Sequence, residues 1–306
     1  MCPVCSAAPA RRVGEYRGSS PALGVQSLMS CAACGLVFAS PMPSPAALDE
    51  YNSHYWREAH GGLDQTRLSW ATDAGLNASR ADFLIAHTKP TLDTVGVLEI
   101  GPGRGYLMRY LRARWPASRY VAVEADATCH DRLRTMGADE VATTLDSVPA
   151  EERFSLVIVS HVLEHVADPI GFLAPMVERL VPGGCLFVET PCRDDTFKPQ
   201  HEPHLLFFDK PSMEALLTRL GCRDVRTSYH GPALASLRHR PSVFSRAMAR
   251  WRRSRAEAAL ASLDLDHLPQ SAAASYVRHL DVQRARKEQA WWLRALATKP
   301  QSGETA

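Results

Sequence analysis

The sequence lacks the features by which membrane proteins and nucleic-acid-binding proteins are usually recognised. No apolar run approaches the roughly 20 residues that a membrane-spanning helix needs. The N-terminus has no signal-peptide organisation, which favours a cytoplasmic protein. The formal net charge is only +2, too small for a general attraction to nucleic acid. The 306 residues are enough for one large domain with additions, or for two domains.

Half of the cysteines are concentrated near the N-terminus. Four of the eight cysteines form two C-x-x-C pairs separated by 25 residues, Cys2 with Cys5 and Cys31 with Cys34. Cytoplasmic thiols stay reduced, so we expect metal ligands or core thiols before disulfides. Two such pairs bring four thiolates into a tetrahedron, as structural zinc requires, and leave no open position for catalysis. Residues 1–40 therefore predict a zinc ribbon; the alternative is a set of unrelated free thiols.

Residues 41–94 predict a connector and then a mainly helical segment that leads into the main domain. Three prolines between residues 41 and 45 stiffen the connector. The aromatic residues after them, Tyr51, Tyr55 and Trp56, suit either a flap over a substrate site or a helix that packs the ribbon onto the main domain. We favour the helix.

The segment from Val97 to Gly105 predicts a buried strand, a glycine-rich turn and the start of a helix. Gly101, Gly103 and Gly105 alternate with other residues. Glu99 precedes the first glycine by two residues. Glycines let the backbone approach a ligand that a Cβ would block, and a helix start offers free N–H groups. A nucleotide-type cofactor site is the functional interpretation, and an ordinary strand-to-helix turn is the alternative.

Two further apolar segments fit the same site. Residues 120–124 end in Glu124, which comes 19 residues after Gly105. An acid at about this place takes the ribose hydroxyls in dinucleotide folds. Residues 154–160 predict a third buried strand, which ends at Ser160. We therefore expect residues 95–240 to form an α/β domain, a Rossmann-like sheet with helices on both faces that closes with a hairpin between residues 224 and 238.

Four blocks in chain order resemble the landmarks of class I methyltransferases that use S-adenosylmethionine. They are the glycine segment Glu99 to Gly105, the strand that ends in Glu124, the block His161 to Pro169, and the segment Arg179 to Glu189. The resemblance implies that the glycine loop wraps the methionine half of the cofactor, with Glu99 beneath it and Glu124 on the ribose. Further cofactor contacts that it implies are Thr144 and Leu145, near the adenine, and Ser160.

Together with the ribbon, these blocks resemble a group of bacterial methyltransferases that carry an N-terminal zinc ribbon. Many of these act in pathways for sugars, surface polysaccharides or secondary metabolites, which implies a small hydroxylated acceptor that is methylated on oxygen. Methylation of carbon or nitrogen stays open.

Two other classes of function compete with this interpretation. Some ribosomal RNA guanine methyltransferases also join a zinc module to this fold. The near-neutral charge and the lack of an Asn/Asp-Pro-Pro-Tyr/Phe motif argue against nucleic acid. A catalytically silent binding protein is disfavoured by the intact glycine loop and by Glu124.

A hydroxyl acceptor needs a base or a metal ion to release its proton. His161 directly follows the third strand and is the first candidate for the base, with His204 as the second. His161, Glu164 and His165 are spaced i, i+3 and i+4, so their side chains lie on one face if the segment is helical. Ubiquinone-pathway O-methyltransferases show Glu-x-x-Glu-His here and bind a divalent metal, so a partial metal site is a second interpretation. Alternatively, His165 holds the loop by hydrogen bonds to the backbone.

Residues 241–306 predict a basic, helical C-terminal extension. Five arginines lie between residues 246 and 255, and a second helix is expected from Tyr276 to Leu296, carrying Trp291 and Trp292. We favour a solvated basic face over a packed apolar stripe. A homodimer contact through these helices and a lid are the alternatives.

The ribbon should hold one zinc ion per chain, which metal analysis of protein purified without added zinc would measure. Cys31→Ser should lose the metal and loosen the ribbon, because metal binding supplies its folding energy. Cys185→Ser, outside both pairs, is the matched control and should keep the full zinc content. Well-folded protein with almost no zinc would contradict the prediction.

Overall fold

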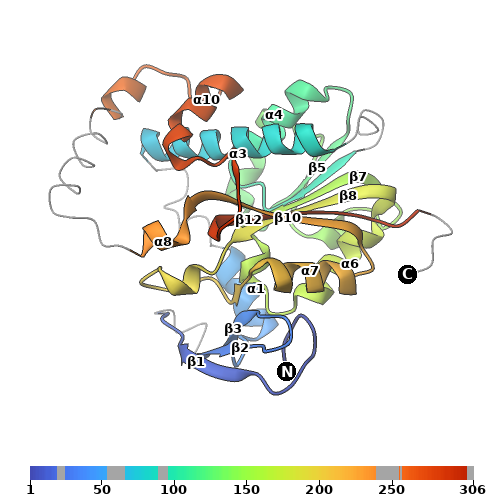
Figure 1. The fold of residues 1–306 in the computed structure, drawn as a ribbon. Helices are drawn as coiled ribbons and strands as arrows, with labels where there is room; N and C mark the ends of the chain where they lie inside the picture. The colour runs from blue at the N-terminus through green and yellow to red at the C-terminus, as the bar shows by residue number, and fades with distance from the viewer. Residues whose placement is uncertain (19–24, 54–65, 89–95, 239–254, 256, 302–306) are drawn as a thin grey trace.

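The computed structural model describes residues 1–18, 25–53, 66–88, 96–238, 255 and 257–301. These residues form an eight-stranded sheet with helices on both faces and a separate four-stranded sheet that contains the N-terminal strands (Figure 1). In this part of the chain, none of the helices combines the length and the apolar content that crossing a bilayer requires.

The large sheet has the strand order β11-β10-β12-β8-β7-β4-β5-β6. Its parallel strands are β4 (Val97–Ile100), β5 (Tyr120–Val123), β6 (Glu140–Ala142), β7 (Phe154–Ser160) and β8 (Leu180–Pro191). Three strands complete the sheet in antiparallel orientation: β10 (Arg223–Ala233), β11 (Ala285–Arg286) and β12 (Ala290–Thr298). β12 lies between β8 and β10, and β11 lies at the edge. Parallel strands are buried on both faces and therefore need nearly continuous apolar runs. The apolar segments that form β4, β5 and β7 meet this need.

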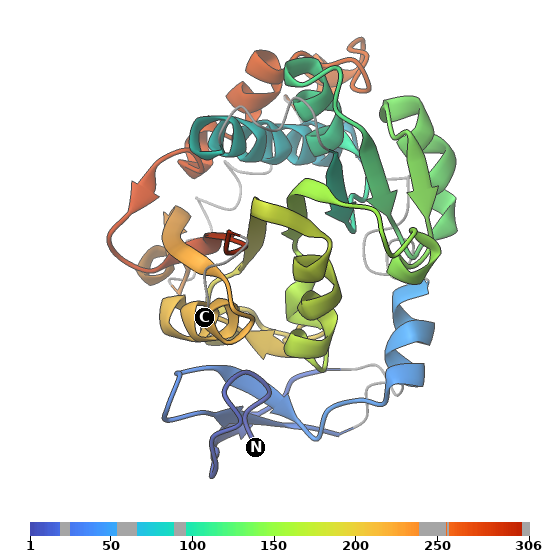
Figure 2. The ribbon, with the colours of Figure 1, turned by 90° about the vertical axis from the view of Figure 1, so that its right-hand side faces the viewer.

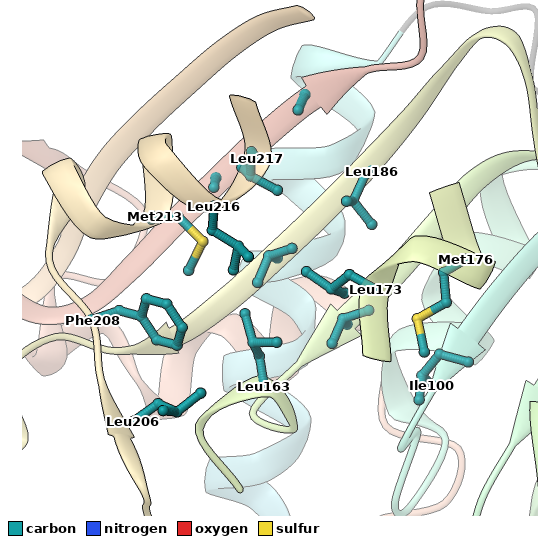
Figure 3. Packing of buried hydrophobic residues seen from close by; sticks show 14 of the residues in the cluster. Ile100, Leu163, Leu173, Met176, Leu186, Leu206, Phe208, Met213, Leu216 and Leu217 are labelled. Carbon is teal, nitrogen blue, oxygen red and sulfur yellow. The ribbon is translucent and has the colours of Figure 1, made fainter. Parts of the chain in front are cut away.

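Two layers of helices cover the large sheet. On one face, α3 (Arg67–His87), α4 (Tyr106–Arg114), α5 (His130–Met136) and α10 (Gln270–Tyr276) share one apolar core. On the other face lie α6 (Pro169–Glu178) and α7 (Lys210–Arg219). Figure 3 shows this second core, in which Leu173 of α6 and Leu216 of α7 gather near Leu186 of β8. The remaining helical elements are short: α1 (Pro45–Ser53), α8 (Leu234–Leu237) and the 3₁₀ turns η3 (Ala127–Cys129), η4 (Leu145–Ser147), η5 (Leu163–His165), η6 (Asp194–Thr196) and η7 (Arg278–Leu280).

The N-terminal sheet contains β1 (Arg11–Glu15), β2 (Ser27–Ser30) and β3 (Val37–Ser40), which pair antiparallel as a ribbon. Its fourth strand, β9 (Leu206–Phe207), comes from the main domain, with Val37 opposite Phe207 and Phe38 opposite Leu206. Two views place this sheet on the α7 side of the large sheet, opposite α3 (Figures 1 and 2). The ribbon is therefore joined to the main domain by backbone hydrogen bonds.

The connector contains the helix that we favoured there, α1. Its Leu48 is buried in the same core cluster as the ribbon cysteines and the α6–α7 layer. Tyr51 packs against that cluster, whereas Tyr55 and Trp56 lie outside the described residues. The helical lead-in to the main domain is α3.

The prediction of a helix from Tyr276 to Leu296 is wrong. Residues from Ala290 onward form β12, and seven of its nine residues are buried between β8 and β10. Because β12 is covered on both faces, its sequence shows no strand-like alternation, and its alanines and leucines favoured a helix. The predicted domain boundary at residue 240 therefore cuts the sheet. The predicted homodimer contact through a helix in this segment is therefore no longer supported, because the helix is not formed there.

The hairpin predicted between residues 224 and 238 is also wrong. β10 continues as one strand through Gly231, and α8 follows it. The strand that pairs with it, β12, begins 57 residues after β10 ends. No turn signal in the local sequence can predict a pairing over that separation. Gly231 has φ +87°, and a Cβ there would lie 2.3 Å from the Trp292 ring. Of the arginines between residues 246 and 255, the described part of the chain includes Arg255 alone.

A buried ionic cluster joins α3, β8 and β12. Glu189 on β8 accepts hydrogen bonds from Arg80 of α3 at 2.6 Å and from Arg294 of β12 at 2.5 Å. All three side chains are nearly inaccessible to water. Burial alone would raise the pKa of Glu189, but the two guanidinium groups hold it well below its usual range. The carboxylate is therefore ionised and compensates two buried positive charges.

Removing this charge should destabilise the protein strongly. Glu189→Gln leaves Arg80 and Arg294 without a counter-charge, which should cost about 3–5 kcal/mol in the free energy of unfolding, measured by urea denaturation. The exposed Glu178→Gln is the control and should change it by less than about 0.5 kcal/mol.

The contribution of Glu189 to the free energy of unfolding depends on pH, and the direction of this dependence follows from its pKa. The native pKa of Glu189 is lower than the value of about 4.3 expected in the unfolded chain, so its contribution is complete above that pH. It is lost progressively as the pH falls from about 4.3 to the native pKa, and the difference in unfolding free energy between wild type and Glu189→Gln should shrink over that range. A difference that stays constant down to pH 3 would contradict this assignment.

Candidate functional site

A cavity of about 650 Å³ lies at the carboxyl ends of β4, β5, β7 and β8. Open α/β sheets bind their ligands at this edge, and the volume suits a small-molecule ligand. The lining includes seven of the eight residues that the sequence assigned to a cofactor: Glu99, Gly101, Gly103, Glu124, Thr144, Leu145 and Ser160. Both candidate bases, His161 and His204, line it as well.

The glycine loop between β4 and α4 needs glycine for two reasons. Gly101, Gly103 and Gly105 all have positive φ, at +67°, +54° and +76°, which side-chain-bearing residues rarely adopt. A Cβ on Gly101 would also lie 2.5 Å from Cγ2 of Val162. Gly105 is outside the cavity lining, and a Cβ on it would lie 3.0 Å from Leu133 of α5. Gly105 therefore serves the packing of α4 against α5.

Glu124, at the end of β5, is tied to the glycine loop. One carboxylate oxygen accepts the N–H of Gly103 at 3.1 Å, and the other accepts the N–H of Asp126 at 3.1 Å. Burial raises the pKa of Glu124, and these two N–H donors oppose the shift. The carboxylate is thus fixed next to the loop, where it can accept the hydroxyls of a ribose.

Glu99 lies on β4 in the wall of the cavity and is buried. Its carboxylate accepts a hydrogen bond from the Tyr120 hydroxyl at 2.5 Å. Burial raises the pKa of Glu99 to about 7, although the Tyr120 hydrogen bond lowers it. Such a carboxyl group can exchange between donor and acceptor forms near neutral pH.

His161 lies between two buried carboxylates. Its Nε2 is 3.1 Å from Glu189 and its Nδ1 is 3.3 Å from Glu164. Burial lowers the pKa of His161, but the hydrogen bonds to the two carboxylates outweigh this effect and raise it. The protonated form, with both ring N–H groups donating, is therefore favoured. A general base needs a free lone pair, so this environment opposes the role that the sequence suggested first.

His204 has a different environment. It precedes β9 and is buried, and its Nδ1 is 2.8 Å from Asp194 of η6. The Lys198 ammonium group lies 2.8 Å from the same carboxylate oxygen. If Nδ1–H donates to Asp194, the lone pair of the neutral ring is on Nε2. This arrangement is that of a histidine base oriented by a carboxylate.

Glu164, His165 and His204 form a second group of interest. Each offers one ligand atom, and these atoms lie within 4.8 Å of one another. Burial lowers the pKa of His165 to about 3, so its ring is neutral, as metal ligation requires. His161 does not belong to this group, because residues 163–165 form a 3₁₀ turn instead of the α-helical face on which the sequence argument depended. His204 takes its place from a loop about 40 residues further on.

The four N-terminal cysteines form a compact cluster with all Sγ atoms within 4.8 Å of one another. The Sγ atoms of Cys2 and Cys34 are 3.6 Å apart, and those of Cys5 and Cys31 are 3.5 Å apart. Zn–S bonds of about 2.3 Å in a tetrahedron give S···S distances of about 3.8 Å. The cluster therefore has the donor set and the spacing that structural zinc requires.

Several residues of the site were missed at the sequence level. Asp194 and Lys198 follow β8, in a loop whose path cannot be derived from spacing. Trp291 and Trp292 also line the cavity, with rings stacked 5.1 Å apart at an interplanar angle of 6°. They reach the cavity because β12 pairs with β8, a pairing that the sequence pattern does not reveal. The signal available in the sequence for Asp194 was an acid three residues after the end of the strand β8.

Comparison with known proteins gives a consistent result. Residues 76–252 match the model of the family described as "Methyltransferase domain". Ubiquinone biosynthesis O-methyltransferase of Parvibaculum lavamentivorans is 34% identical over 135 residues, which cover 42% of this chain and 51% of that protein. The enzyme of the same name from Bradyrhizobium sp. is 30% identical over 134 residues, with the same coverage. The chain thus spans about half the length of these curated relatives.

Two solved structures share the fold at low sequence identity. The methyltransferase in complex with the Trm112 methyltransferase activator of Haloferax volcanii has a TM-score of 0.52 at 14% identity, covering 84% of this chain and 100% of that one. Phosphoethanolamine N-methyltransferase 2 of Haemonchus contortus, in complex with S-adenosylmethionine, has a TM-score of 0.51 at 15% identity, covering 87% and 62%. The predicted fold, a Rossmann-like methyltransferase sheet with a small cysteine-bearing N-terminal sheet, is confirmed.

Titration calorimetry with S-adenosylmethionine should show one site per chain. Gly103→Val should abolish binding, because its side chain fills the space next to the loop and Glu124. Glu124→Gln, which keeps the shape, should weaken binding about ten- to hundredfold through weaker hydrogen bonds. Gly14→Val in β1, where a Cβ meets nothing within 4 Å, is the control. Wild-type affinity of both cavity variants would refute the cofactor site.

Proposed function

The chain belongs to the methyltransferase-domain family, and from this premise we propose that it transfers a methyl group from S-adenosylmethionine to a hydroxyl oxygen of a small metabolite. The S-adenosylmethionine-dependent methyltransferase activity follows from the family. The acceptor class is the proposal, and the two curated relatives named above, both O-methyltransferases, support it.

The cofactor residues are proposed from the cavity lining. Gly101 and Gly103 would admit the methionine half of the cofactor, with Glu99 beneath it. Glu124 would accept the ribose hydroxyls, and Thr144 and Leu145 would border the adenine. Ser160, at the end of β7, would complete the wall. When bound, S-adenosylmethionine supplies a methyl group on a positively charged sulfur, so the chain mainly has to align the acceptor and take up one proton.

The observation that carries the proposed mechanism is the hydrogen bond of 2.8 Å between Asp194 and His204, which itself lines the cavity. Asp194 orients the ring and stabilises the imidazolium that forms when Nε2 accepts the acceptor's hydroxyl proton. Burial alone would raise the pKa of Asp194, but His204 and Lys198 hold it well below its usual range. The acid is thus ionised throughout the reaction. We therefore place the base at His204 and assign His161 to holding Glu164.

The acceptor is proposed to be a sugar or a secondary-metabolite intermediate. The cavity combines the apolar ring surfaces of Trp291 and Trp292 with polar side chains such as Asn77 and Lys198. Flat apolar surfaces with a few polar groups suit a ring that carries hydroxyls. The formal net charge of +2 remains an argument against a nucleic-acid acceptor.

A metal-assisted reaction is the second candidate, supported by the grouping of Glu164, His165 and His204. A divalent ion held there would bind the acceptor hydroxyl and lower its pKa, and His204 would then be a ligand instead of a base. The two candidates make different predictions for chelation, so one set of assays separates them.

The single-turnover rate, measured at saturating acceptor chosen from a panel of phenols and hexose derivatives, tests the assignment. His204→Ala should lower this rate about 10²- to 10⁴-fold with almost unchanged cofactor affinity, because only the proton acceptor is lost. Asp194→Asn should lower it as well, since the ring loses its carboxylate partner. His267→Ala, an exposed histidine paired with Asp264, is the control.

Three outcomes would change the proposal. A rate near that of wild type for His204→Ala would remove this base. Activity lost to a chelator and restored by Mg²⁺, at unchanged zinc content, would favour the metal role instead. Methylation of ribosomal RNA without turnover of any small acceptor would overturn the acceptor class.

A further inference from the structure

The N-terminal ribbon contacts the loop that carries the proposed base. This loop, residues 192–205, connects β8 to β9 and contains Asp194, Lys198 and His204. Asp194, His201 and His204 are buried, with 1%, 2% and 6% of their surface exposed. None of the residues proposed for the cofactor belongs to the ribbon, so these contacts raise the question of what the ribbon does.

Arg17, just after β1, makes the central contacts. Its backbone N–H donates to Nδ1 of His201 at 3.0 Å, and its carbonyl oxygen accepts the N–H of His201 at 2.8 Å. Its guanidinium group donates to the carbonyl oxygens of Lys198 at 2.8 Å and of Asp195 at 3.3 Å. One ribbon residue thus fixes both ends of the stretch from Asp195 to His201.

From there a short chain of contacts leads to the base. The backbone of Lys198 is held by Arg17, and its ammonium group lies 2.8 Å from Asp194. The same carboxylate oxygen of Asp194 is 2.8 Å from Nδ1 of His204. The N–H of His204 in turn donates to the carbonyl oxygen of His201, at 2.9 Å. The orientation of the His204 ring therefore depends on a loop conformation that Arg17 stabilises.

The ribbon holds the far end of the loop as well. Directly after His204, the carbonyl oxygen of Leu205 accepts the N–H of Ala39 at 2.8 Å, and β9 pairs with β3. The N–H of Leu205 donates to the carbonyl oxygen of Glu164 at 2.7 Å, on the cavity side. The segment is thus fixed between the ribbon and the cavity wall.

We propose that the ribbon forms part of the acceptor side of the active site, with Arg17 as a positioning residue that sets the orientation of His204 through Lys198 and Asp194. This inference rests on the proposed role of His204 as the base. It predicts that disturbing the ribbon at Arg17 impairs proton removal and leaves the cofactor site intact, because the glycine loop and Glu124 belong to other elements.

The direct test reads the tautomer of His204 in full-length protein labelled with ¹⁵N-histidine. In wild type, the ring should be fixed with its proton on Nδ1, facing Asp194. Arg17→Ala should give a mixture of tautomers and lower the single-turnover rate about 10- to 100-fold, the effect of a displacement near 1 Å. Its affinity for S-adenosylmethionine should equal that of wild type. Arg17→Lys, which keeps one donor, should restore part of the rate.

Two variants make the result specific. Arg12→Ala is the control, since Arg12 lies in the same ribbon but contacts Ser27 and Glu15. Lys198→Met breaks the contact with Asp194 without touching the ribbon, and should reproduce the tautomer mixture at full zinc content. This variant keeps the test valid if Arg17→Ala loosens the ribbon as a whole.

The outcomes separate the two proposals. A fixed Nδ1–H tautomer and a wild-type rate in both Arg17→Ala and Lys198→Met would overturn the coupling, even if His204→Ala is inactive. A tautomer mixture in both variants, together with an active His204→Ala, would uphold the coupling and reject His204 as the base.

Discussion

The buried carboxylate of Glu189 is the interaction on which the arrangement of this molecule depends. It brings together a helix before the sheet, a central strand and the last strand of the chain, through Arg80 and Arg294. Ions of this kind are tolerated in an interior only when each charge has a close partner. The three elements must therefore assemble together, and the C-terminal strand β12 cannot be a detachable extension. The two arginines that pair with Glu189 lie 109 and 105 positions away in the sequence, one in α3 and the other in β12.

The same carboxylate also influences the chemistry of the cavity. His161 lies between Glu189 and Glu164, and this environment favours its protonated form. His204 has one carboxylate within hydrogen-bond distance, that of Asp194, on one ring nitrogen. Two histidines in one cavity thus have different functions open to them because their neighbours differ, which is the usual way in which proteins separate acid, base and structural roles. Charge distribution, more than proximity to the strand end, distinguishes the two.

The two halves of the cavity are built differently. The residues proposed for the cofactor come from consecutive strand–turn–helix units, so their geometry follows from local sequence. The proposed acceptor side collects residues from β12 and from the loop after β8, which Arg17 of the N-terminal ribbon contacts. Variation in these outer parts can change the acceptor while the cofactor half stays as it is. This division agrees with the general finding that function resides in loops placed on a rigid scaffold.

The sequence by itself determined what depends on short-range spacing: the strands around the glycine loop, the acids Glu99 and Glu124, and the two cysteine pairs. In these segments the pattern and the backbone geometry are local, so they can be predicted without knowing the neighbours. Only the tertiary structure decided that residues 290–298 form a strand, that β9 completes the ribbon, and that His204 meets Asp194. Strand pairing and the protonation of a histidine depend on partners far away in the chain, and burial on both faces removes the alternation that would have revealed β12.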